Sequence, residues 1–87
     1  SYNDLIIRGT QTQFIPYKGV YVIARQYQGK VSLTVLNGTT KPAVMKVARY
    51  QEVIGSATRV RDVLTGRYYD LSSDLSLKPR QSLVLSW

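Results

Sequence analysis

Side chains able to catalyse a reaction are scarce in this chain of 87 residues. It contains no histidine and no cysteine, so the common nucleophile–base pairs and the usual transition-metal ligands are missing. Two carboxylates on either side of a cleft could hydrolyse a glycosidic bond. The acidic candidates are Asp4, Glu52, Asp62, Asp70 and Asp74. The last three lie at predicted turns, where aspartate commonly bonds its own backbone. We therefore predict no catalytic, metal-binding or cofactor-binding residue here.

Tyrosine is the one unusually frequent residue type, with seven copies. Exposed aromatic rings can stack on sugar faces or nucleobases, which makes Tyr17, Tyr27 and Tyr68 candidates for sugar stacking. Tyrosine is also a favoured strand residue whose ring packs while its hydroxyl stays in water. The pattern favours this structural role. Trp87 is in register with Leu83 and Leu85, and we expect it to be a core residue or an anchor of the chain end.

The chain is basic, with 12 lysines and arginines, 5 acidic residues and a net charge of +7. Such a charge could attract nucleic acid, anionic lipid or acidic glycans. The basic residues are nevertheless spread along the chain, and only Arg59 and Arg61 lie close together in sequence. This spread predicts solvated strand faces and no nucleic-acid partner. No apolar run approaches the ~20 residues of a membrane-spanning helix, so we predict no membrane span.

The clearest structural pattern is a hairpin over residues 20–37. Its second half alternates Val31, Leu33 and Val35 with polar residues, which is typical of a strand with one buried face. Its first half, residues 20–23, is apolar without a break, which predicts a strand covered on both faces. The pair Gln28 and Gly29 supplies the two-residue turn between them.

Further short strands are predicted at residues 43–47, 58–64, 67–71, 75–77 and 82–87, separated by polar turns. A single helical turn is expected from Arg49 to Ile54, ended by Gly55. These elements predict an all-β fold, an antiparallel β-sandwich of about six to eight short strands of Greek-key type, with a small barrel as the alternative. We predict one domain over residues 1–87, with residues 1–15 as a connector and residues 16–87 as the sandwich.

The order of these features resembles the C-terminal β-sandwich domain of the α-amylase superfamily of glycoside hydrolases, in particular the cyclomaltodextrinase and neopullulanase group. The matching segments are residues 14–16, 20–25, 31–37, 49–54, 62–66 and 77–85. The polar residues 10–13 and the basic residues 59–61 depart from the pattern, which leaves the subfamily open.

The resemblance implies an accessory role for the chain. Such a domain follows a catalytic (β/α)8 barrel, whose Asp and Glu residues hydrolyse α-1,4-glucosidic bonds and lie outside this chain. The implied partners are the barrel of the same polypeptide and, through the parent enzyme, its α-glucan substrate. In this interpretation Leu5, Ile6, Ile7, Phe14 and Ile15 form the interface with the barrel.

Two other function classes stay open on the sequence. One is an autonomous carbohydrate-binding module that uses exposed tyrosines, and the other is a basic nucleic-acid-binding β-barrel. The lack of cysteine gives no redox information on the compartment. Localisation would follow the parent enzyme, for which we expect a periplasmic or secreted location, with the cytoplasm as the alternative.

Overall fold

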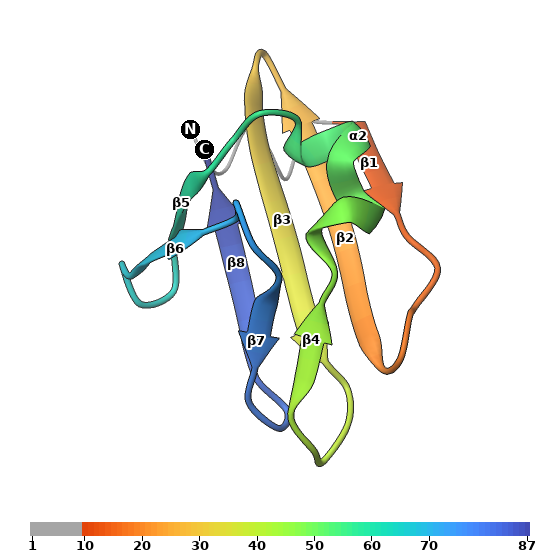
Figure 1. Ribbon diagram of the computed structural model, residues 1–87. Coiled ribbons are helices and arrows are strands. Elements are labelled where there is room, and N and C mark those ends of the chain that lie inside the picture. Colours follow the sequence, from red (N-terminus) through yellow and green to blue (C-terminus); the bar gives the residue numbers. More distant parts are fainter. Residues whose placement is uncertain (1–9) are drawn as a thin grey trace.

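The computed structural model describes residues 10–87, which form two antiparallel sheets and one short helical segment (Figure 1). The all-β sandwich predicted from the sequence is confirmed. In chain order the elements are β1 (Thr10–Gln13), β2 (Val20–Tyr27), β3 (Lys30–Asn37), β4 (Ala43–Met45), η1 (Val47–Tyr50), α2 (Gln51–Ile54), β5 (Arg59–Asp62), β6 (Tyr68–Asp70), β7 (Leu75–Leu77) and β8 (Ser82–Ser86). The predicted helical turn is confirmed as the 3-10 turn η1 followed by α2. Neither is long and apolar enough to cross a membrane.

One sheet has six strands in the order β1-β2-β3-β8-β5-β6, and the other pairs β4 with β7. Figure 1 shows β4, β7 and the helical segment lying in front of the large sheet. The last strand, β8, lies between β3 and β5, and its pairs include Val35 with Leu83 and Leu33 with Leu85. The sheet is therefore completed only when the end of the chain inserts into its middle.

Two tight turns set the position of β2. The loop between Tyr27 and Lys30 has positive φ at both central residues, 48° at Gln28 and 79° at Gly29. This is the type I′ geometry that suits the twist of a two-residue hairpin, so the predicted turn is confirmed. Lys18 and Gly19, with φ of 50° and 81°, make the same kind of turn just before β2.

The core lies between the large sheet and the layer of β4, β7 and the helices. Alternate residues of β2, β3 and β8 point into it and meet side chains of the second layer. Its main members are Val20, Val22, Ala24, Leu33, Val35, Leu83 and Leu85 from the large sheet, with Met45, Tyr50, Ile54, Leu75 and Leu77 opposite. Trp87 packs partly buried against this cluster, as predicted.

The first strand corrects the predicted boundary between connector and sandwich. Thr10–Gln13 pairs antiparallel with β2 over four residues, so the sheet begins before residue 16. β1 is an edge strand, and all four of its side chains are exposed. Without an apolar residue the segment shows no alternation, which is why the sequence did not predict a strand there. The predicted interface residues Leu5, Ile6 and Ile7 lie outside the described residues.

Candidate functional site

Asp62, the only carboxylate with no exposed surface within residues 10–87, has a structural role. Its carboxylate accepts hydrogen bonds from the Val84 N–H at 3.1 Å, the Leu64 N–H at 3.2 Å and the Thr65 hydroxyl at 2.8 Å. Burial by itself raises the pKa of Asp62, but these hydrogen bonds outweigh it and hold the pKa below its ordinary value. A buried carboxylate whose oxygens are occupied in this way has no room for a substrate.

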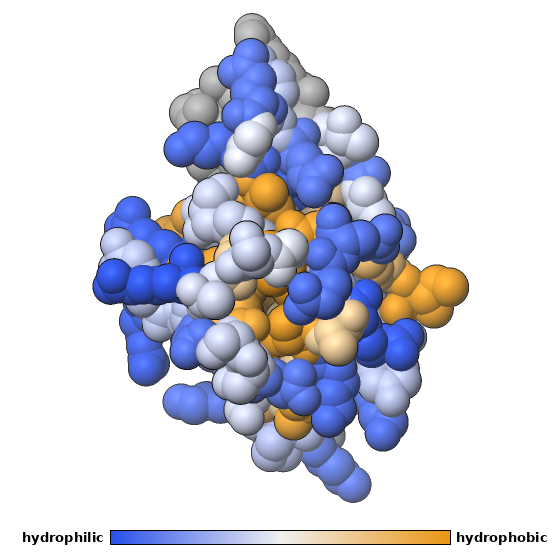
Figure 2. Space-filling view, turned by 45° about the horizontal axis from the view of Figure 1, so that its top comes forward, coloured by the Kyte–Doolittle hydropathy of each residue, from blue (hydrophilic) through white to orange (hydrophobic). Residues whose placement is uncertain are grey.

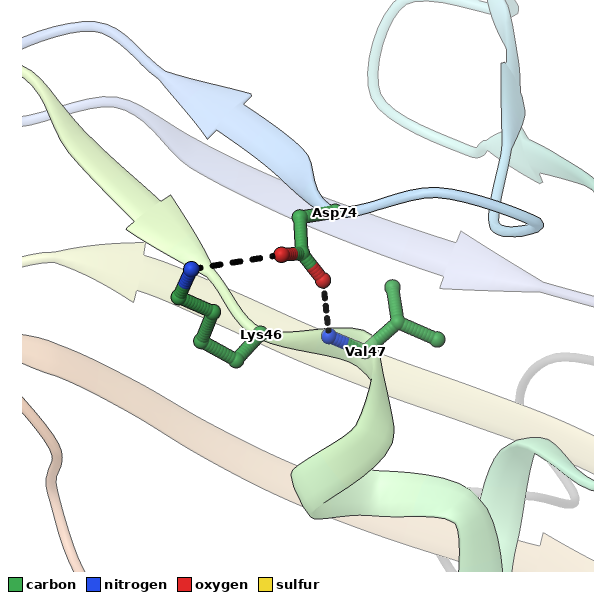
Figure 3. A network of polar contacts seen from close by, with 3 residues as sticks. All are labelled: Lys46, Val47 and Asp74. Atoms are coloured by element: carbon green, nitrogen blue, oxygen red, sulfur yellow. Dashed lines mark hydrogen bonds and ion pairs between the residues drawn. The ribbon is translucent and has the colours of Figure 1, made fainter.

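Asp70 and Asp74 are also bound within the fold. The Ser72 hydroxyl and N–H hold the pKa of Asp70 below its ordinary value, with the N–H at 2.8 Å, as expected for an aspartate at a turn. Asp74 differs from the prediction, because it accepts the Val47 N–H at 3.0 Å and pairs with the Lys46 ammonium at 3.4 Å (Figure 3). Asp74 thereby ties the start of β7 to the start of η1. Within residues 10–87, no three metal-ligating side chains gather into a cluster.

The three predicted sugar-stacking tyrosines do not form one platform. Tyr17 precedes β2 and Tyr27 ends it, so a strand of eight residues, about 26 Å long, separates them. Tyr68 lies on β6, across β3, β8 and β5 from β2, which is roughly 20 Å. Tyr17 and Tyr27 are half-buried, whereas Tyr68 is 57% exposed. Any sugar contact would therefore be made by single rings.

Arginine side chains cover two of these rings. The Arg49 guanidinium lies 3.8 Å from the centre of the Tyr17 ring, and the Arg59 guanidinium lies 4.0 Å from the centre of the Tyr68 ring. Such cation–π stacks give the tyrosine rings favourable contacts within the domain, without a bound ligand. Tyr68 nevertheless borders a cleft of about 490 Å³, which is also lined by Thr58, Arg59, Tyr69, Asp70 and Ser72.

Phe14 and Ile15, both predicted at the interface with the barrel, differ in exposure. Phe14 is half-buried, and its ring meets the Tyr50 ring edge-on with centroids 5.0 Å apart, so it belongs to this domain's own packing. Ile15 is 85% exposed. Phe14 thus has contacts inside this domain, whereas Ile15 projects into solvent. The interface with a preceding barrel stays a prediction for both residues.

A basic groove is the feature that sequence reasoning missed. Lys18, Lys41 and Lys46 come together around a hollow of about 490 Å³ whose other lining residues are Tyr17, Thr39, Pro42, Ala43 and Val44. The Gly38 N–H donates to the Gly19 carbonyl at 2.9 Å and so holds the Lys18 turn beside the loop that carries Lys41. This contact brings Lys18 next to Lys41 and Lys46, which are more than 20 residues away in the sequence. The spread of basic residues along the sequence therefore does not exclude a local cluster in the folded domain.

Comparisons with known proteins agree with this description. A sequence profile of the family described as Cyclo-malto-dextrinase C-terminal domain matches residues 11–86. The solved structure of AmyP in complex with maltose superposes with a TM-score of 0.72 at 20% identity, over 95% of this chain and 17% of that chain. Trehalulose synthase MutB from Pseudomonas mesoacidophila MX-45 gives a TM-score of 0.67 at 18% identity, over 94% of this chain and 15% of that chain.

These structural likenesses, at identities of 20% and 18%, establish the fold. The present chain corresponds to less than a fifth of the length of each of those proteins. The family profile covers nearly all residues that the structure describes. It thus confirms the resemblance to the C-terminal domains of the α-amylase superfamily, and this chain belongs to the Cyclo-malto-dextrinase C-terminal domain family.

Proposed function

We propose that this domain is the non-catalytic C-terminal accessory part of a starch- or maltodextrin-degrading glycoside hydrolase of cyclomaltodextrinase or neopullulanase type. It caps and stabilises the catalytic barrel of the same polypeptide, and α-glucan is the substrate of that barrel. The family match over residues 11–86 carries the proposal. The hydrogen bonds of the aspartates support a non-catalytic role, because Asp62, Asp70 and Asp74 all accept hydrogen bonds from backbone N–H groups of the domain itself.

The proposal is tested in the full-length polypeptide by deleting residues 10–87. We expect the truncated enzyme to unfold at a lower temperature and to yield less soluble protein, because the barrel surface beneath the domain is then exposed to water. Cleavage of cyclodextrin per folded molecule should persist, since the chemistry resides in the barrel. An unchanged melting temperature would contradict a stabilising role. Cleavage of cyclodextrin by the 87-residue chain alone would contradict its non-catalytic character.

A second candidate function is carbohydrate binding at the Tyr68 cleft. It is favoured by the exposed ring and by the polar side chains of Arg59 and Asp70 beside it, the combination with which proteins hold sugars. In the intact enzyme, Tyr68→Ala would then reduce adsorption to insoluble starch without changing the melting temperature. Leu64→Ala is the matched control, because Leu64 is 62% exposed on the neighbouring turn but does not line the cleft. Equal adsorption by both variants would dismiss this function.

A further inference from the structure

The side of the six-stranded sheet that points away from β4 and β7, here called the outer face, carries an exposed apolar pair. Tyr21 of β2 lies directly opposite Leu36 of β3 in the register, so both side chains point to the same side. Their neighbours Val20, Val22 and Val35 point into the core, so this shared side is the outer one. Tyr21 is 47% exposed and Leu36 is 39% exposed.

Further apolar side chains lie next to this pair. The next row across the outer face runs from Gln13 through Ile23 and Thr34 to Val84, and its last three members are half-buried. On the other side, the Phe14 N–H donates to the Val22 carbonyl at 3.0 Å, so the following residue, Ile15, lies alongside Tyr21 at the edge of the sheet. We define the outer-face patch as Ile15, Tyr21, Ile23, Leu36 and Val84. The next outer-face row along β2 contains a charged side chain, Arg25.

The patch also resolves a discrepancy between sequence and structure. Residues 20–23 form an unbroken apolar run, which is typical of a strand covered on both faces. Among the described residues, Val20 and Val22 are buried on one side of β2, while Tyr21 on the other side is 47% exposed. The composition of β2 therefore fits a strand that has a second layer over its outer face. No described element of this domain supplies that layer.

The other exposed apolar side chains among the described residues lie on different elements. Val44, 43% exposed on β4, lies in the basic groove among lysines. Leu64 lies on the turn between β5 and β6, and Tyr68, 57% exposed on β6, is stacked by Arg59. On the face shown in Figure 2, the central hydrophobic areas lie between hydrophilic side chains, and one hydrophobic group protrudes at the right edge. A partner that buries apolar surface would thus gain more on the outer face than around Val44 or Leu64.

We propose that the outer-face patch docks onto an apolar surface of the domain that precedes this one in the same polypeptide. The inference rests on the proposed function. The related chains are several times longer than this one, which covers only 17% and 15% of them, so a large preceding region is expected for a C-terminal domain. A covalently linked partner is present at high effective concentration, which favours it over a second copy. Interfaces between domains bury roughly 600–1,500 Å², so the patch would form the centre of a larger contact.

Cysteine labelling in the full-length enzyme tests the proposal, because this chain has no cysteine of its own. Leu36→Cys is compared with Val44→Cys, two strand positions of similar exposure in the domain, at 39% and 43%. N-ethylmaleimide is added to the native enzyme, and the labelled peptides are quantified by mass spectrometry. We expect Leu36→Cys to react at least about tenfold more slowly than Val44→Cys, since its thiol is reached only after the domains separate. In denaturant the two rates should be equal.

Equal native labelling rates would overturn the proposal. Protection of Leu36→Cys that disappears on dilution would also overturn it, because the occupant would then be a second copy. Tyr21→Cys provides a second position on the patch if the Leu36 variant does not fold. The deletion of residues 10–87 separates this outcome from a failure of the proposed function. If deletion destabilises the barrel while Leu36→Cys reacts freely, the domain stabilises the barrel through another surface.

Discussion

A buried polar side chain, Asn37, holds the ends of strands together. Asn37 has no exposed surface, and its side-chain amide donates to the Lys41 carbonyl at 2.7 Å and the Lys78 carbonyl at 3.0 Å. Its side-chain oxygen accepts the Thr39 N–H and the Thr39 hydroxyl. Asn37 therefore fastens the loop after β3 to the chain before β8. Within residues 10–87 every buried side-chain nitrogen or oxygen has a hydrogen-bond partner.

Replacement of Asn37 by Asp should destabilise the domain although it keeps the shape of the side chain. The carboxylate cannot donate to the carbonyls of Lys41 and Lys78, and it places a charge where no water reaches. Losses of this kind cost about 2–4 kcal/mol. Urea unfolding of the 87-residue chain, followed by the fluorescence of its single tryptophan, measures the effect. A change below about 0.5 kcal/mol, as is usual for surface substitutions, would contradict the assigned role.

Asp62 should make the stability of the domain depend on acidity. Its pKa is lower in the folded state than in the unfolded chain, so the ionised form stabilises the fold. This contribution is fully present above the unfolded pKa of about 3.9 and is lost as the pH falls through the lower folded pKa. We expect the unfolding free energy of the natural chain to fall over this range. Asp62→Asn should be less stable at pH 7 and should show a smaller fall. Parallel curves for the two proteins would show that another group causes the acid sensitivity.

At the scale of elements, turn residues determine how well the hairpins form. Gln28 adopts a φ of 48°, a left-handed conformation that asparagine tolerates better than glutamine. Gln28→Asn creates the Asn-Gly pair preferred in type I′ turns and should stabilise the domain by about 0.5 kcal/mol. The control is Gln26→Asn, an exposed position within β2 where asparagine is a poorer strand residue and no gain is expected. Equal effects on the melting temperature at both positions would rule out the turn as the cause.

The accuracy of sequence-based prediction also differs from element to element. The hairpin of β2 and β3 could be predicted because Val31, Leu33 and Val35 alternate and Gly29 allows the tight turn. β1 could not, because Thr10–Gln13 is polar on both faces and is identified as a strand only by its hydrogen bonds to β2. The basic groove was equally hidden. It depends on a contact between the Lys18 turn and the loop after β3, which no local pattern encodes.

At the scale of the whole molecule, the order of the strands makes β8 the link between the two parts of the large sheet. Leu85 pairs with Leu33 of β3 on one side and with Asp62 of β5 on the other. These neighbours are distant in sequence, so the fold forms only when its last strand is in place. The alternating pattern around Leu83, Val84 and Leu85 was enough to predict that β8 is a strand. Its central position was not, because sequence spacing does not specify which strands it joins.

This topology predicts that damage to β8 affects the domain as a single unit. Leu85 has no exposed surface, so Leu85→Ala removes buried apolar volume next to both β3 and β5 and should cost about 2–5 kcal/mol. Small domains are stable by only about 5–15 kcal/mol, so this is a large fraction of the total. Unfolding should stay a single transition when it is followed both by Trp87 fluorescence and by circular dichroism of the sheet. Leu64→Ala, at a position 62% exposed, is the control and should leave the midpoint nearly unchanged. If the two signals separated in the Leu85 variant, the halves of the sheet on either side of β8 would fold independently, and β8 would not be the element that unites them.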